Sequence, residues 1–277
     1  MKFGYCVNML SLPGGDGSGR EFIPMIADIG FDYAELPLAQ MMRYSDAEFE
    51  DLFIRPLESS GIACRCCNNF LPGNIRLTGP DADHASAFRY AEKALARAAA
   101  LKAEKIVFGS SGARNYPLGY PREEAERQVM AFLRGLAPIV SEYPVTIVLE
   151  HLNKLESNLL NSLREGIRMR RELNLPYVRN LLDVYHLALA GETTEAIREA
   201  GEYLRHVHIA RTLGRSLPCE GDECGWRELF SVLKETGYDG DISIEAYAPA
   251  ENREECLRES LRFLKSQADT AGRRSSV

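Results

Sequence analysis

The feature that most limits the fold of this 277-residue chain is a regular alternation of short apolar runs with longer helix-forming segments. The short runs are rich in Val, Ile and aromatic residues, which favours strands, and the segments between them have helical composition and periodicity. Eight such runs occur, at residues 3–9, 31–36, 62–70, 105–108, 144–150, 178–183, 203–209 and 241–245. Strict alternation of this kind indicates a parallel sheet whose strands are joined by helices.

Eight strand–helix units predict an α/β protein with a single closed (β/α)₈ barrel over residues 1–277, undivided by any linker. The polar tail 267–277 is expected to be frayed. A doubly wound open sheet is the structural alternative. The Gly-rich loop 11–19 lacks a dinucleotide fingerprint, which argues against it. Helices are expected at about 20–29, 46–60, 83–102, 121–142, 160–174, 192–200, 226–236 and 251–265.

The composition excludes several kinds of partner. A hydrophobic content of 45% and a charged content of 26% describe a globular protein with ample core material. The net charge of −7 argues against a nucleic-acid or anionic-membrane partner. No apolar run approaches the roughly 20 residues of a membrane span, and no signal-peptide core is present, so we expect a cytoplasmic protein. The spacings of the seven Cys residues do not match a zinc-ribbon pair, and these residues are expected to be free, mostly buried thiols.

Each of the last four predicted strands ends on a potential metal ligand. These residues are Glu150, Asp183, His208 and Glu245. The active site of such a barrel lies at the C-terminal ends of its strands, and an acid there is costly unless a metal, a partner or chemistry uses it. One such residue could equally be a solvated acid or a satisfied histidine, but four on consecutive strands favour a site. Three carboxylates and one imidazole suit Mn²⁺, Mg²⁺, Co²⁺ or Fe²⁺ better than a thiolate-loving metal.

Side-chain alternation decides which residues face the barrel interior. His206 and His208 share one face of their strand, and Ser243 and Glu245 share one face of theirs. The intervening residues are apolar and should meet the helices. His208 is nearer the strand end and is therefore the expected ligand, while His206 is expected to support the site or simply to be buried.

Several motifs, taken together, resemble one known family. They are Glu150-His151-Leu152-Asn153-x-x-Glu156-x-Asn158, Leu182-Asp183-x-x-His186, His206-Val207-His208-Ile209-Ala210, Arg215, Gly237-Tyr238-Asp239-Gly240 and Ile244-Glu245. The pattern is similar to that of the sugar isomerase/epimerase family, in the xylose isomerase-like TIM barrel superfamily. This group includes ketose 3-epimerases such as tagatose and psicose 3-epimerase, hydroxypyruvate isomerase and, more distantly, endonuclease IV. The resemblance covers most of the chain.

The resemblance implies a metal-dependent sugar isomerase or epimerase, which transfers a proton next to a carbonyl through a metal-stabilised enediolate. It implies a divalent metal, Mn²⁺ first and Zn²⁺ among the alternatives, and a sugar or sugar derivative as partner. It also implies a homo-oligomer, either a dimer or a tetramer. By resemblance the metal ligands are Glu150, Asp183, His208 and Glu245, the acid/base pair is Glu150 and Glu245, and the residues that bind substrate oxygens are Glu156, His186 and Arg215.

Departures from the family pattern leave the substrate open. His151 stands where the family usually has Pro, Arg211 where it usually has Asp or Glu, and loop 8–20 lacks the aromatic residues that many ketose 3-epimerases place over the sugar. A lyase could perform β-elimination on a modified sugar or glycoside with the same metal site. An endonuclease IV-like DNA repair enzyme would need more histidines and a basic face. A non-catalytic sugar-binding barrel is disfavoured because both acid/base candidates are present.

Overall fold

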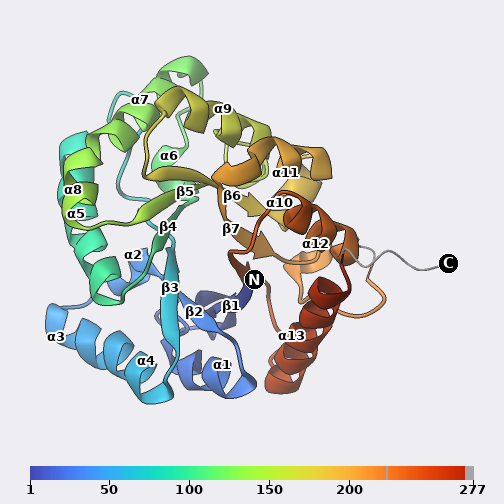
Figure 1. Ribbon diagram of the computed structural model, residues 1–277. Helices are drawn as coiled ribbons and strands as arrows, with labels where there is room; N and C mark the ends of the chain where they lie inside the picture. Colours follow the sequence, from blue (N-terminus) through green and yellow to red (C-terminus); the bar gives the residue numbers. More distant parts are fainter. Residues whose placement is uncertain (223, 272–277) are drawn as a thin grey trace.

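A closed barrel of eight parallel strands forms the centre of the computed structural model (Figure 1). The structure describes residues 1–222 and 224–271. The strands pair in chain order, and the first closes on the last, which confirms the (β/α)₈ barrel and excludes the open sheet. Their bounds are β1 Lys2–Cys6, β2 Tyr33–Pro37, β3 Ala63–Asn68, β4 Lys105–Phe108, β5 Thr146–Glu150, β6 Val178–Asp183, β7 Leu204–Ile209 and β8 Asp241–Ile244.

The helices surround the barrel and connect one strand to the next (Figure 1). A π-helical turn over Glu50–Ile54 joins α3 to α4, so the helix expected over 46–60 is continuous. The bounds are α1 Ile23–Ile29, α2 Leu38–Met41, α3 Asp46–Phe49, α4 Arg55–Ser60, α5 His84–Ala100, α6 Ser111–Arg114, α7 Arg122–Gly135, α8 Ala137–Glu142, α9 Leu163–Leu173, α10 Val184–Leu189, α11 Thr194–Ala200, α12 Trp226–Glu235 and α13 Arg253–Thr270.

Two expected elements change at their ends. The first strand stops at Cys6 rather than at residue 9, because Val7–Leu10 forms a 3₁₀ turn at the mouth of the barrel. The helix expected over 121–142 is two helices, α7 and α8, which meet at Leu136. Pro138 lies at the start of α8, where its missing N–H leaves no helical hydrogen bond unmade.

The expectation of a frayed tail over 267–277 is wrong for its first part. Helix α13 runs to Thr270, past the expected end at residue 265. Leu257, Leu261, Leu264 and Ala268 form one buried stripe at helical spacing, so packing extends the helix. Residues 272–277 of the expected tail lie outside the described part of the chain.

The barrel interior has an apolar layer below its polar mouth. Cys66, Val107, Val148 and Leu181 form a cluster separate from the main core, and all four are buried. Val148 and Leu181 each precede a strand-end acid by two residues and so share its face. The strand-end acids at the mouth of the barrel therefore lie directly above this apolar layer.

The opposite end of the barrel holds an ion-pair cluster. The buried carboxylate of Asp241 pairs with Lys105, and its Oδ2 lies 3.0 Å from Arg65 Nε. Arg65 also contacts the carboxylate of Glu104 at 2.9 Å. Because these residues come from β3, β4, β8 and the turn before β4, the cluster joins β8 to two strands that are not its neighbours in the ring.

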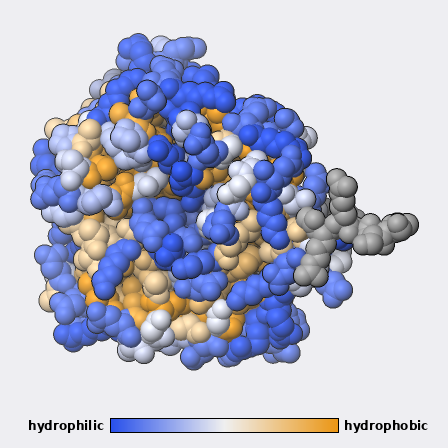
Figure 2. Space-filling view, in the orientation of Figure 1, coloured by the Kyte–Doolittle hydropathy of each residue, from blue (hydrophilic) through white to orange (hydrophobic). Residues whose placement is uncertain are grey.

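Hydrophilic side chains cover much of the visible face of the molecule, and apolar patches lie between them (Figure 2). None of the helices in the described part of the chain is long and apolar enough to cross a bilayer.

Candidate metal centre

The four expected ligands converge at the C-terminal mouth of the barrel. Glu150 and Asp183 end β5 and β6, His208 lies one residue before the end of β7, and Glu245 directly follows β8. One ligand atom from each residue lies within 4.8 Å of the others. All four are largely buried, so their charges interact at short range with little water between them.

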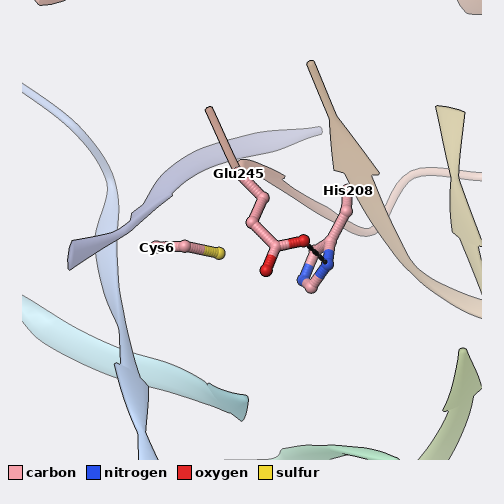
Figure 3. A group of neighbouring side chains, drawn as sticks. All are labelled: Cys6, His208 and Glu245. Atoms are coloured by element: carbon pink, nitrogen blue, oxygen red, sulfur yellow. Dashed lines mark ion pairs between the residues drawn. The ribbon is translucent and has the colours of Figure 1, made fainter. Parts of the chain in front are cut away.

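His208 occupies the middle of this group. Its Nδ1 is 2.9 Å from Glu150 Oε1 and 3.0 Å from Glu245 Oε2, and the second of these contacts is drawn in Figure 3. Its Nε2 is 3.0 Å from Glu35 Oε1. Burial opposes protonation of the ring, but the carboxylates of Glu35 and Glu245 outweigh it and raise the pKa of His208 well above its usual value. A cation held here would replace the proton on Nδ1.

Glu35, in β2, is a residue of the site that the sequence analysis left out. It is fully buried, and its Oε2 accepts hydrogen bonds from Ser243 Oγ at 2.5 Å and from His206 Nε2 at 2.8 Å. Burial opposes its ionisation, but His208 and His206 lower the pKa of Glu35 well below its usual value. Glu35 therefore remains a carboxylate that orients both histidines. His206, which was expected either to support the site or simply to be buried, is buried and bonded to Glu35.

Glu150 and Glu245 stand in contrasting electrostatic environments. Burial, followed by the negative charges of Glu245 and Asp183, raises the pKa of Glu150 above its usual value. Burial would also raise the pKa of Glu245, but Arg215 and His208 hold it at about 2. Two carboxylates whose pKa values are pushed apart can act as the acid and the base of one reaction.

Arg215 lies directly against the carboxylates. Its Nη2 is 2.6 Å from Glu245 Oε2 and 3.5 Å from Asp183 Oδ2, and its Nη1 is 3.8 Å from Glu156 Oε1. The guanidinium also lies over the ring of Tyr185, 4.9 Å from its centroid. Arg215 is thus held in place from two sides rather than being a solvated loop arginine.

His186, at the start of α10, presents an unused donor to the same region. Its Nδ1 accepts a hydrogen bond from the backbone N–H of Asn153 at 3.1 Å, so the ring proton lies on Nε2. This fully buried Nε2 has no hydrogen-bond partner and lies 3.7 Å from Asp183 Oδ2 and 3.9 Å from Glu156 Oε2. A buried N–H without a partner is unfavourable, and an oxygen of a bound ligand would satisfy it.

Two other features shape the group. Cys6 lies beside His208 and Glu245, with its thiol turned toward the Glu245 carboxylate (Figure 3). Burial raises the pKa of the Cys6 thiol well above its usual value, so it stays neutral and is a poor ligand.

Gly109, the residue directly after β4, leaves room for the Glu150 side chain. A Cβ on Gly109 would meet Glu150 Oε2 at 2.0 Å, so this position must be glycine for Glu150 to keep its place.

One cavity of about 420 Å³ opens onto these groups. Glu150, Glu156, Arg215 and Glu245 border it on one side, and Asn8, Gln40, Arg43 and Asn69 border it on the other. Its size is within the range of small-molecule sites, roughly 300–1,000 Å³. The structure therefore brings all seven residues expected from the sequence to one mouth of the barrel, four of them as ion-pair partners of Arg215 or His208.

Comparison with known proteins gives a consistent result. Residues 23–267 match the family model described as xylose isomerase-like TIM barrel. The chain is 27% identical over 235 residues to the D-psicose 3-epimerase of Ruminiclostridium cellulolyticum, which covers 82% of this chain and 78% of that protein. It is 28% identical over 153 residues to the 3-dehydro-D-guloside 4-epimerase of Escherichia coli, covering 54% of this chain and 58% of that protein.

A solved structure of D-psicose 3-epimerase from Clostridium cellulolyticum, determined with D-tagatose, is similar in fold. The TM-score is 0.84, and the match covers 97% of this chain and 99% of that one. The sequence identity of 21% means that this likeness concerns the fold.

Proposed function

The chain belongs to the xylose isomerase-like TIM barrel family, and from this premise we propose that it is a sugar isomerase-type enzyme, most closely a metal-dependent ketose 3-epimerase. The observation that carries the proposal is the convergence of three carboxylates and one imidazole within 4.8 Å at the mouth of the barrel. The names of the relatives, which are epimerases of ketoses and of a keto-glycoside, support the same reaction class.

The donor set fits a hard divalent cation. Glu150, Asp183 and Glu245 bring three negative charges together, and Arg215 compensates only part of this charge. The metal would be held by these carboxylates and by His208 Nδ1, with Mn²⁺ as first choice and Mg²⁺, Co²⁺, Fe²⁺ or Zn²⁺ as alternatives. When bound, the cation supplies a Lewis acid for the carbonyl oxygen of a ketose.

Glu156, His186 and Arg215 position the sugar. The free Nε2–H of His186 donates to a substrate oxygen, and Glu156 accepts from a hydroxyl. Asn153 Nδ2 donates to Glu156 Oε1 at 2.8 Å, which fixes that carboxylate in the direction of the cavity. Arg215 balances negative charge that develops on the substrate beside Glu245.

Glu150 and Glu245 move the proton. The strands that carry them, β5 and β8, are three steps apart in the ring, so the two carboxylates approach a bound ketose from different directions. One removes the proton next to the carbonyl, which leaves an enediolate, and the other returns a proton to the opposite face, which inverts that carbon. Both carboxylates are ionised when they hold a cation, so the one that faces the C3 proton of the bound epimer acts as the base.

A lyase is the second candidate. An enediolate can expel a group β to the carbonyl instead of taking back a proton, and that reaction needs only one of the two bases. The relative named 3-dehydro-D-guloside 4-epimerase is itself an epimerase, but its name describes a glycoside that carries a ketone, which is the class of compound on which such a lyase would act.

Two further expectations belong to the proposal. All seven cysteines are free, and four of them are buried, which supports a reducing, cytoplasmic location. The dimer or tetramer expected from the family resemblance stays a prediction.

Deuterium exchange tests the proposed reaction. Protein loaded with Mn²⁺ is incubated in D₂O with D-fructose, D-psicose and D-tagatose, and the C3 position is followed by NMR. We expect exchange at C3 together with formation of the epimer, and loss of both after treatment with EDTA. Exchange without inversion would favour a one-base isomerase, and expulsion of an aglycone from a 3-keto-glycoside would favour the lyase. Absence of reaction with all of these compounds, and with D-fructose 6-phosphate and D-fructuronate, would contradict the proposed function.

A further inference from the structure

The cavity has a second wall that the chemistry above does not use. It is formed by the segments after β1, β2 and β3, and it contributes Asn8, Gln40, Arg43 and Asn69. In the closed ring β2 lies four steps from β6, so the segment after β2 is opposite the strand that carries Asp183. One end of a molecule bound at the carboxylates therefore extends toward this second wall.

Arg43 gives the second wall a positive charge that the protein leaves unpaired. Its Nη1 donates to the backbone oxygen of Asp16 at 3.3 Å, and no carboxylate of the described residues forms an ion pair with it. The Asp16 carboxylate is itself occupied, because it accepts hydrogen bonds from Arg20 Nε at 2.9 Å and from Tyr44 OH at 2.5 Å. The guanidinium of Arg43 thus retains most of its donors for a ligand.

Gln40, beside Arg43, provides a second unmet polar group. Its terminal Oε1 is buried and has no hydrogen-bond partner, although the residue borders the cavity. Buried polar atoms are normally satisfied, and the amide can present either its oxygen or its N–H₂ in this position. The wall therefore offers one cation and one amide without protein partners at the same end of the cavity.

The two walls differ in charge, and this difference indicates the kind of substrate. Arg215 is committed to Glu245, Asp183 and Glu156, whereas Arg43 has no such partner. An anionic group placed near the carboxylates would be repelled, but the same group at the far wall would meet an uncompensated guanidinium. The residues that border the cavity include no aromatic ring, so stacking on a neutral sugar is not the means of recognition there.

We propose that the substrate is a ketose that carries an oxyanion, either a phosphate or a carboxylate, at the end remote from its carbonyl, and that Arg43 and Gln40 bind this group. The inference rests on the proposed function for the position of the carbonyl. A guanidinium matches both phosphate and carboxylate with two parallel N–H donors, which makes Arg43 the residue that determines specificity.

Binding and exchange are measured on the same Mn²⁺-loaded protein with three probes: D-fructose, D-fructose 6-phosphate and D-fructuronate. Calorimetry gives the affinities, and exchange at C3 in D₂O gives the reaction. The variant is Arg43→Gln, and the control is Arg89→Gln, which removes the same charge from an exposed site on α5. We expect one anionic probe to bind more tightly than D-fructose. Arg43→Gln should reduce the affinity ratio of anionic to neutral probe by about tenfold or more, in line with loss of a charged hydrogen bond.

The outcomes separate the two proposals. Preference for D-fructose 6-phosphate or for D-fructuronate identifies the oxyanion. If no anionic probe binds better than D-fructose, or if Arg43→Gln and Arg89→Gln give the same affinity ratio, the oxyanion site is excluded even when C3 exchange occurs. If exchange fails with every probe while Arg43→Gln alone loses the anionic preference, the proposed reaction fails and the oxyanion site stands.

Discussion

His208 is held between Glu35 and Glu150. Its Nε2 lies 3.0 Å from Glu35 Oε1, and its Nδ1 lies 2.9 Å from Glu150 Oε1. The contact with Glu35 uses the nitrogen that faces away from the ligand set, so it fixes both the ring plane and the tautomer that leaves Nδ1 for a cation. The carboxylate in β2 thereby orients the proposed ligand His208 on β7, three strands away around the ring.

Glu35→Gln should weaken metal binding without removing a ligand. The neutral amide favours a proton on Nε2 less strongly than the carboxylate does, and the loss of such a supporting carboxylate typically reduces metal affinity by about 10–100-fold. Titration with Mn²⁺ measures the affinity, and circular dichroism verifies the fold. The exposed Glu58→Gln removes the same charge elsewhere and should leave the affinity as it was. Equal affinities in the two variants would contradict the role given to Glu35.

Asp183→Ala should abolish metal binding while the barrel remains folded. Asp183 also accepts the backbone N–H of His186 at 3.1 Å and so caps α10, which adds a stability loss of about 1 kcal/mol to the loss of the metal. Asp183→Asn keeps a capping side chain and isolates the effect of the charge. Elemental analysis of the purified variants measures occupancy. Full occupancy in the Ala variant would remove Asp183 from the ligand set.

His186→Ala should impair turnover or substrate binding and leave the metal content near that of the parent. The Nε2 of the ring has no hydrogen-bond partner and lies 3.9 Å from Oε2 of Glu156, which borders the cavity, whereas Nδ1 is engaged by Asn153. Steady-state kinetics with the best ketose and elemental analysis of the same sample test this division of roles. A variant that loses its metal would instead identify His186 as a ligand.

Glu150→Gln and Glu245→Gln should each lose epimerisation. Gln keeps an oxygen that can bind the metal but cannot accept the proton, and loss of an acid/base group typically lowers the rate by about 10²–10⁴-fold. With Mn²⁺ restored, each variant should still exchange the C3 proton of the one epimer whose base it retains. NMR in D₂O starting from each epimer distinguishes them. If both metal-loaded variants epimerise at the rate of the parent protein, the two-base mechanism is excluded.

Asp241→Asn should destabilise the fold at neutral pH. Removing one partner of a buried ion pair costs about 3–5 kcal/mol, because Lys105 loses its counter-charge. Burial opposes ionisation, but Lys105 and Arg65 lower the pKa of Asp241 in the folded state. The stabilisation is therefore complete above the unfolded pKa of about 3.9 and is lost as the pH falls through the lower folded-state value.

Urea unfolding of the parent and of Asp241→Asn at pH 7 and in acid measures this effect. The gap between the two midpoints should be large at pH 7 and should narrow in acid. Asp81→Asn, at an exposed position, provides the control. A gap that does not change with pH would show that the loss is due to packing rather than charge.

The fold and the cluster of strand-end carboxylates were predictable from the sequence. Strand ends can be located from local periodicity, and the barrel rule then places Glu150, Asp183 and Glu245 at one mouth. Their convergence is confirmed by the structure, while their roles as ligands and bases stay predictions. Glu35 was visible at the end of its strand, but its contact with His208 depends on how the ring closes, which no local pattern encodes.

Arg43 and Cys6 were missed for a related reason. Arg43 follows a four-residue helix, α2, that carries no periodicity of its own, and only the turn of that helix brings the guanidinium to the cavity. Cys6 became a neighbour of the site because β1 ends early, at the 3₁₀ turn. Element boundaries are set by tertiary packing, so residues that depend on them are difficult to identify from a single sequence.

Gly109 makes the site sensitive at a position that carries no functional group. The hydrogen on its Cα faces the space in which the Glu150 carboxylate lies, and a methyl group there would meet Oε2 at 2.0 Å. Any other amino acid at position 109 would therefore displace the Glu150 carboxylate, and the proposed ligand would be lost from its position although residue 150 itself is unchanged. In a library of single substitutions, position 109 should tolerate as little change as the acids themselves, although it contributes no atom to the chemistry.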